Sequence, residues 1–164
     1  MSSQVPIVRP MSWRAALPQF VMMAVFIGLS CAFLGREGVM LGAIAFLVYS
    51  IGSRMILMRA HRAGIGLLRQ RRYQEAIPKF QESFDFLERH AWIDRFRSIV
   101  LMSPSAVSYR EMALANIAFC YAQLGDGAQC RSYYERCLCL NPQNGLATAG
   151  MRMLDAGASA PPKS

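Results

Sequence analysis

The stretch ALPQFVMMAVFIGLSCAFL, residues 16–34, decides how this sequence is interpreted, because it holds no charged residue over 19 positions. A helix of that length is long enough to cross the hydrocarbon core of a bilayer, which is roughly 30 Å thick. Helices in the core of a soluble protein usually have shorter apolar runs, of about 10–14 residues. We therefore expect a membrane-spanning helix here, with a buried core helix and a cleaved signal peptide as the alternatives.

A second apolar stretch follows directly after the turn Gly35-Arg36-Glu37-Gly38. It covers residues 39–58 and contains one charge, Arg54, whose long side chain can extend to the lipid headgroups. An exported protein with a cleaved signal peptide needs no second apolar segment, so this favours a retained pair of spans. The sequence thus predicts a transmembrane hairpin over residues 16–58, preceded by an N-terminal tail over residues 1–15.

The net charge of +8 is concentrated around these apolar stretches. Residues 1–72 contain nine basic residues and one acid, whereas residues 73–164 contain nine of each. A nucleic-acid-binding domain would carry its basic patch on the folded unit, so we expect no nucleic-acid partner. The basic excess instead fits contact with lipid headgroups, for which we single out Arg54, Arg59 and Arg62.

Orientation follows from the same charges. Arg9 and Arg14 precede the first span, and the three interfacial arginines end or follow the second. The positive-inside rule then predicts that both termini lie in the cytoplasm and the connecting turn lies outside. A bacterial inner membrane is the expected location, with an organelle membrane as the open alternative.

The second half of the chain has helical patterns throughout. Ser108 and Glu111 form a capping box, which predicts that a helix begins at Tyr109. Leu124-Gly125-Asp126 ends that helix, and another helix is expected over residues 128–140. Together with the two spans, these patterns predict an all-α fold.

The stretch ALANIAFCYAQLGDGAQCRSYYERCLCLNP, residues 113–142, resembles one tetratricopeptide repeat, a 34-residue helix–turn–helix unit. Its signature positions are occupied by residues of fitting size or chemistry, namely Leu114, Ile117, Ala118, Tyr121, Cys130, Tyr134, Cys137 and Pro142. A weaker copy covers residues 57–88, and its small position is Gly64. The resemblance implies a helical domain over residues 59–156. It consists of repeats at 57–88 and 111–144, an insertion at 89–108 and a final capping helix, followed by a disordered tail at 157–164.

In this family the first helices of successive repeats line a concave face that holds peptides or partner helices. The resemblance assigns that face to Met112, Ala115, Phe119, Ala122 and Gln123 in the stronger copy. In the weaker copy it assigns His61, Ile65, Leu68 and Arg69. Plain core packing is the alternative for the apolar members of this set. The insertion either covers the repeats or contacts a partner or the membrane.

The five cysteines are an odd number without a CxxC pair, so we expect no disulfide framework and a reducing compartment. Neither histidine nor acidic residues join Cys130 and Cys137 at metal-ligand spacing, so no metal site is expected. The sequence contains no catalytic or nucleotide-binding motif. We therefore predict neither enzyme activity nor a cofactor.

Two functions remain in view. The first is a membrane-tethered tetratricopeptide-repeat adaptor or scaffold that mediates protein–protein interaction on the cytoplasmic face. The alternative is a subunit or assembly factor of a membrane complex that acts mainly through its hairpin, where Gly28, Ser30 and Cys31 suit close helix packing. A homo-oligomer is a further option, because two repeats are fewer than such domains usually need for stability.

Overall fold

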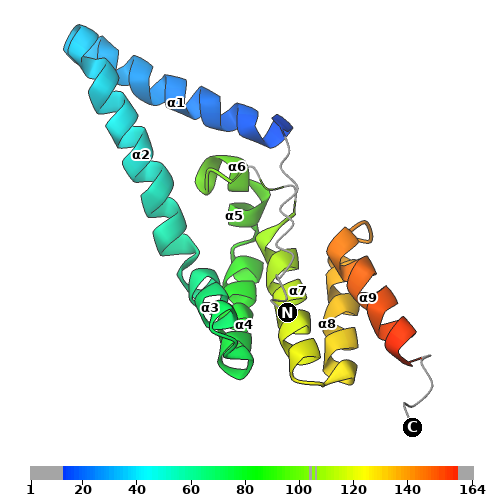
Figure 1. The fold of residues 1–164 in the computed structure, drawn as a ribbon. Coiled ribbons are helices and arrows are strands. Elements are labelled where there is room, and N and C mark those ends of the chain that lie inside the picture. Colours follow the sequence, from blue (N-terminus) through cyan, green and yellow to red (C-terminus); the bar gives the residue numbers. More distant parts are fainter. Residues whose placement is uncertain (1–12, 104, 106, 159–164) are drawn as a thin grey trace, which may run out of the picture. The chain divides into compact units, whose positions relative to one another are not determined.

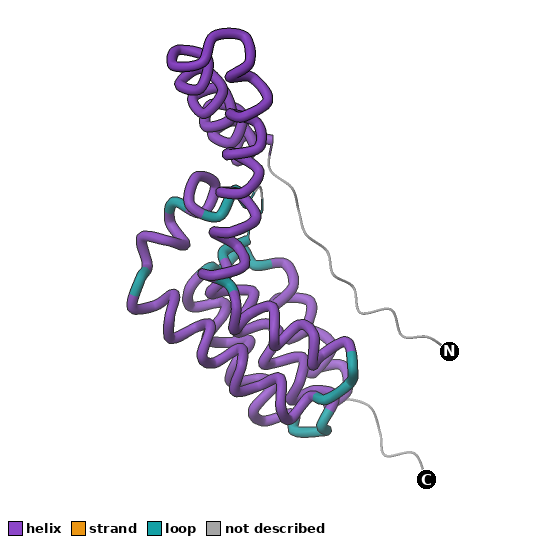
Figure 2. The backbone as a smooth tube through the Cα atoms, turned by 90° about the vertical axis from the view of Figure 1, so that its left-hand side faces the viewer, coloured by secondary structure: helices purple, strands orange, loops and turns teal. Residues whose placement is uncertain are grey.

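The computed structural model describes residues 13–103, 105 and 107–158. This part of the chain is helical and contains no strand, which confirms the all-α prediction for the residues described (Figure 1, Figure 2). Of the two predicted tails, only residues 13–15 and 157–158 are described, and they are helical. The rest of the predicted tails, residues 1–12 and 159–164, lies outside the described residues.

The chain divides into two compact units. The first, which we call the hairpin unit, comprises Met1–Leu57 and Arg95–Ser108. The second, the helical unit, comprises Met58–Asp94 and Tyr109–Ser164. The predicted insertion at 89–108 is therefore split, because its residues from Arg95 onwards fold with the hairpin.

The hairpin unit is built on α1 (Trp13–Leu34) and α2 (Gly38–Leu57), joined by the short 3-10 helix η1 (Gly35–Glu37). The two helices form a V that is closed at η1 (Figure 1). Near the turn their backbones approach closely at Gly38 and Gly42, where a side chain would collide with the backbone of α1. Further along, the ring of Phe26 packs against Phe46 and Tyr49 of α2.

The stretch Leu17–Leu57 is long and apolar enough to cross a membrane, and an 18-residue window within it has a mean hydropathy of 2.0. It is the single candidate for a membrane span among the described residues, by length and composition. Large apolar side chains point outward along both of its helices, among them Leu17, Phe20, Phe33, Met40, Val48 and Ile56. An exposed apolar surface of this size is unusual for a soluble monomer.

The five longer helices of the helical unit follow one another in space, and each of the last four packs against the preceding one of the set. They are α3 (Arg59–Arg69), α4 (Tyr73–Arg89), α7 (Tyr109–Gln123), α8 (Gly127–Leu140) and α9 (Gly145–Ala158). The helices predicted to begin at Tyr109 and to cover 128–140 are thus present within one residue. The final helix extends two residues beyond the predicted boundary at residue 156.

Two short helices complete the described chain. They are α5 (Ala91–Arg95), whose Ile93 and Asp94 are buried, and α6 (Arg97–Val100) in the hairpin unit. α5 ends at Arg95, one residue past the boundary between the two units, so the chain passes from one unit to the other at the end of this helix.

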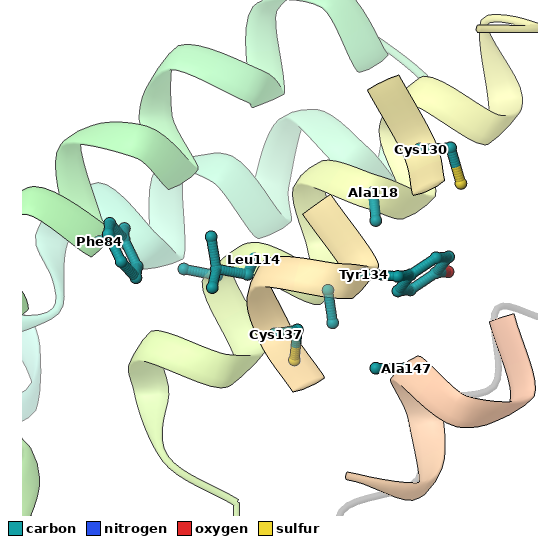
Figure 3. Close-up of a cluster of buried hydrophobic side chains, with 9 residues drawn as sticks. Phe84, Leu114, Ala118, Cys130, Tyr134, Cys137 and Ala147 are labelled. Atoms are coloured by element: carbon teal, nitrogen blue, oxygen red, sulfur yellow. The ribbon is translucent and has the colours of Figure 1, made fainter. Parts of the chain in front are cut away.

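The core of the helical unit consists of two hydrophobic clusters. One joins α4, α7, α8 and α9 and includes Phe84, Cys130, Tyr134, Cys137 and Ala147 (Figure 3). The other joins α3, α4 and α7 around Phe80. Small residues at these contacts, including the cysteines and Gly64 beside the Phe80 ring, allow the helices to approach closely.

Candidate functional site

The nine residues predicted to form a binding face lie on α3 and α7 of the helical unit, with unequal exposure. Three are buried, namely His61, Leu68 and Ala115. Three are half-buried, namely Ile65, Met112 and Phe119. Three are exposed, namely Arg69, Ala122 and Gln123. Part of the predicted face therefore lies inside the unit, and part is accessible.

His61 is a packing residue between three helices. Its ring lies edge-on to Phe80 of α4, with 5.5 Å between the ring centroids, and to Tyr109 of α7, at 5.4 Å. Its Nδ1 atom lies 3.5 Å from the hydroxyl of buried Ser83. This surrounding leaves His61 little contact with solvent, so it is not available to a partner.

The structure brings together the predicted residues of α3 and those of α7. Leu68 is part of the hydrophobic cluster around Phe80, and Ile65 and Phe119 pack against the edge of the same cluster. Leu68 thus contributes to the core, whereas Ile65 and Phe119 form its solvent-facing margin. For Leu68, Ala115 and His61, burial favours the alternative of plain core packing.

One side of α7 remains open along its length. Met112, Asn116, Phe119 and Gln123 recur at helical spacing, and none of them is buried. The neighbouring positions Ala113, Leu114, Ala115, Ile117 and Ala118 are all buried. We call these four residues the open stripe. Sequence analysis missed Asn116, although its place one turn after Met112 was a sufficient signal.

The α3 helix carries a strongly basic surface. Arg62, Ile65 and Arg69 are spaced to share one face, and both arginines are exposed. Between Met58 and Arg72 there are five arginines and no acidic residue. Only one of the five, Arg72, has a described salt bridge, with Glu75. A partner surface that carries carboxylates would therefore complement this helix.

A hollow of about 190 Å³ lies between α4, α7 and α8, away from the residues that sequence analysis selected. Its lining consists of Gln81, Phe84, Asp85, Leu114, Ile117, Tyr133 and Arg136. Gln81 donates a hydrogen bond to the Tyr133 hydroxyl at 2.9 Å. The Arg136 guanidinium lies 5.0 Å from the centroid of the Tyr133 ring and 5.5 Å from that of Phe84.

The hollow is smaller than the roughly 300–1,000 Å³ of typical small-molecule pockets, so its size suits a single side chain of a larger ligand. Sequence spacing puts Tyr133 and Arg136 on neighbouring positions of one helix. The contribution of Phe84 from α4 was not accessible to sequence reasoning, because it depends on how α4 packs against α7.

The cysteines differ in their burial. All five are free thiols, and Cys120, Cys130 and Cys137 are buried. Burial raises the pKa of Cys120 and Cys137 to about 12, so both are protonated at neutral pH and are poor nucleophiles and ligands. Within the described ranges, no group of three or more His, Cys, Asp or Glu side chains is placed to hold a metal ion.

The three arginines predicted at the membrane interface have different surroundings. Arg59 and Arg62, in the first turn of α3, are exposed. Arg54, in the last turn of α2, is half-buried, and its Nε donates a 2.6 Å hydrogen bond to the carbonyl of Leu101. Its Nη2 donates to the carbonyl of Met102. Arg54 thus binds protein backbone, a role that sequence analysis did not foresee.

The described surface therefore combines half-buried apolar side chains, amides and arginines on α3 and α7. Aromatic and arginine side chains often dominate the energetics of protein–protein interfaces. Comparison of the chain with protein-family models, with curated proteins and with solved structures gave no match.

Proposed function

We propose that this chain is a membrane-tethered adaptor of the tetratricopeptide-repeat type, which binds a partner protein on the cytoplasmic face of the membrane. The observation that carries the proposal is the open stripe of α7, Met112, Asn116, Phe119 and Gln123. Gln123 is exposed and the other three residues of the stripe are half-buried, while Ala113, Leu114, Ala115, Ile117 and Ala118 of the same helix are buried. Such a surface suits a helix or an extended peptide as its ligand.

The repeat assignment draws support from the helix pairs. In the proposed alignment, α3 and α4 form one repeat, and α7 and α8 form the other. The equivalent small positions are Gly64 and Ala118, and both are buried at helix contacts. The inserted residues from Arg95 to Ser108 fold with the hairpin. α4 therefore packs directly against α7, as the second helix of one repeat packs against the first helix of the next.

The proposed tether consists of α1 and α2 crossing the membrane twice, with η1 on the far side. No acidic residue occurs between Gly38 and Arg72, whereas arginines cluster directly after α2. The positive-inside rule then favours a cytoplasmic location for the helical unit and both termini, and the membrane that we propose is a bacterial inner membrane. We further propose that the partner segment carries both apolar and acidic side chains, to match Phe119 and the arginines of α3.

Site-specific photo-crosslinking in native membranes tests this function. A photo-reactive residue is placed at Asn116 or Gln123 of the open stripe, and at Glu135, an exposed position of α8, as the matched control. We expect one protein to be captured from both stripe positions and not from Glu135, and the Arg69→Glu substitution to reduce its capture. Equal capture from Glu135, or no capture from the stripe, contradicts the adaptor proposal.

The alternative function, a membrane-complex subunit that acts through its hairpin, is favoured by one observation. Large apolar side chains are exposed along α1 from Leu17 to Leu34 and along α2 from Val39 to Ile56, and they leave room for other membrane helices as well as lipid. Replacing residues 16–58 with an unrelated two-span anchor separates the two functions. The adaptor keeps the crosslink from Asn116 after the replacement, whereas the complex subunit loses its activity in the cell.

A further inference from the structure

The segment Arg95–Ser108 is attached to α2 by side chains that lie near the C-terminal end of that helix. The Arg54 guanidinium donates hydrogen bonds to the carbonyls of Leu101 and Met102. One and a half turns earlier, the Tyr49 hydroxyl lies 3.5 Å from the carbonyl of Ile99. α6 also packs against α1, and Figure 1 shows it at the open end of the V. The segment is therefore part of the hairpin structure.

These contacts set the depth of the segment. With a rise of about 1.5 Å per residue, Tyr49 and Arg54 lie roughly 17 and 24 Å along α2 from Gly38. The hydrocarbon core is about 30 Å thick, so both residues fall in the half of the membrane that lies away from η1. Tyr49 thus lies near the middle of the core, whereas Arg54 lies about 6 Å from the far boundary, and an arginine side chain is long enough to extend from there to the headgroups.

Four backbone carbonyls of the described part of the segment accept hydrogen bonds from the protein. Besides the carbonyls bound by Arg54, Ser103 N donates to the Arg97 carbonyl at 3.1 Å, and Arg97 Nε donates to the Ser105 carbonyl at 3.1 Å. Non-helical backbone is tolerated at membrane depth only when protein satisfies its polar groups. This requirement is met at the carbonyls of Arg97, Leu101, Met102 and Ser105.

Met102 shows how firmly the segment is held. Its backbone has φ of 45°, in the left-handed region that β-carbon-bearing residues rarely adopt, and its side chain is buried. Such a conformation persists only where surrounding contacts hold it. The bond from Arg54 to the Met102 carbonyl is one of these contacts, so Arg54 fixes the segment to α2.

The outer surface of the segment combines apolar and basic side chains. Phe96 is 51% exposed and Ile99 is 38% exposed. Both belong to the unit that contains the membrane-span candidate. Arg95 is exposed beside them, and Arg97 is half-buried. An apolar surface with flanking arginines is typical of elements that lie in the membrane interface, where anionic headgroups attract the arginines.

We infer that residues Arg95–Ser108 form an interfacial element that inserts Phe96 and Ile99 into the boundary between headgroups and acyl chains. It lies in the leaflet that contains the end of α2. The inference rests on the proposed membrane insertion of α1 and α2. It assigns a lipid ligand to residues Arg95–Ser108. The chain then contacts the membrane through this element as well as through α1 and α2.

Quenching of tryptophan fluorescence by brominated phosphatidylcholine tests the inference in the full chain, reconstituted into vesicles. The natural Trp13 and Trp92 are replaced by phenylalanine, and single tryptophans are introduced as Phe96→Trp, Val48→Trp and Leu124→Trp. Val48 is an exposed position within α2, and Leu124 is an exposed position in the turn after α7. Phe96→Trp replaces one aromatic residue with another at a half-exposed site, so the folding of the chain is expected to be retained.

We expect the Phe96→Trp variant to lose fluorescence, most strongly with bromines close to the headgroup. The Val48→Trp variant should also lose fluorescence, and the Leu124→Trp variant should not. Unquenched fluorescence from position 96, with quenching at position 48, overturns the inference and leaves the membrane anchor intact. A blue-shifted but unquenched signal from position 96 also overturns it, because protein then covers the site. An unquenched position 48 contradicts the membrane anchor itself.

Discussion

The carboxylate of Glu111, near the start of α7, accepts a hydrogen bond from the side-chain amide of Asn144 at 2.7 Å. The amide of Asn141 donates to the same oxygen at 2.9 Å. Asn144 in turn accepts a hydrogen bond from the backbone N–H of Ala147 at 3.0 Å, which caps the N-terminus of α9. Glu111 and Asn144 are both buried, so this pair links the beginning of α7 to the beginning of α9.

Substituting Asn144→Ala removes both the cap of α9 and a donor to a buried carboxylate. We expect the free energy of unfolding of the helical unit to fall by about 2–3 kcal/mol. Chemical denaturation of the full chain in detergent, followed by circular dichroism, measures this change. The exposed Glu88→Ala variant serves as the control and should differ from the parent by less than about 0.5 kcal/mol. Equal stability of the two variants contradicts the structural role of Asn144.

Asp94 caps α7 from a distant position in the sequence. Its buried carboxylate accepts hydrogen bonds from the backbone N–H groups of Tyr109, at 2.9 Å, and of Arg110, at 3.3 Å. Removing these acceptors with Asp94→Ala should lower the free energy of unfolding by about 2–3 kcal/mol. Asp94→Asn keeps one acceptor oxygen and should cost less. A loss no larger than that of the exposed Asp85→Ala control argues against this cap.

Gly64 and Gly66 of α3 form a matched pair for testing the contact between α3 and α4. A β-carbon at Gly64 would lie 2.8 Å from the buried Phe80 ring, whereas a β-carbon at Gly66 would meet nothing within 4 Å. We expect Gly64→Ala to destabilise by about 1–3 kcal/mol through overpacking. Gly66→Ala should stabilise by about 0.5–1 kcal/mol, because alanine favours the helix. Thermal denaturation of both variants measures the difference. Melting temperatures that shift in the same direction would show that α3 and α4 leave room for a β-carbon at position 64.

The buried thiols make stability depend on pH in the alkaline range. Burial raises the pKa of Cys120 and Cys137 from 9.0 to about 12 in the folded state, while the same thiols in the unfolded chain have a pKa near 9. Between pH 9 and 12 the unfolded state therefore binds fewer protons, so these thiols make the free energy of unfolding fall as pH rises. Below pH 9 both states hold the protons, and the thiols add no slope.

Denaturation at a series of pH values from 8 to 11 measures that slope. The double variant Cys120→Ala/Cys137→Ala should show a shallower decline than the parent chain, whatever its absolute stability. Cys139→Ala, at an exposed position of α8, should leave the slope unchanged. Identical slopes in all three proteins would mean that the two buried thiols ionise normally.

The helices were largely predictable from the sequence, because their signals are local. The uncharged run before Leu34 and the apolar run from Gly38 to Leu57 each form one helix in the structure. The capping box predicted the start of α7 at Tyr109, and Leu124-Gly125 marked its end. Cys130 and Cys137 occupy two signature positions of the stronger repeat copy, and both are buried.

The candidate site was predictable only in part. The pattern placed His61, Leu68 and Phe119 on first helices, but exposure depends on what the neighbouring helices cover, and His61 and Leu68 are buried. The hollow beside Arg136 needs Phe84 from α4 and Tyr133 from α8 at once. No spacing within one helix reveals such a combination.

Sequence alone determined the all-helical character, the apolar stretch Leu17–Leu57 and the concentration of basic charge beside it, because these follow from composition and local periodicity. Tertiary structure decided that Asp94 caps α7, that Arg54 binds the carbonyls of Leu101 and Met102, and that the insertion divides after Asp94. These partners lie between 15 and 48 residues apart in the chain. A hydrogen bond between such distant groups exists only once packing has brought their helices together.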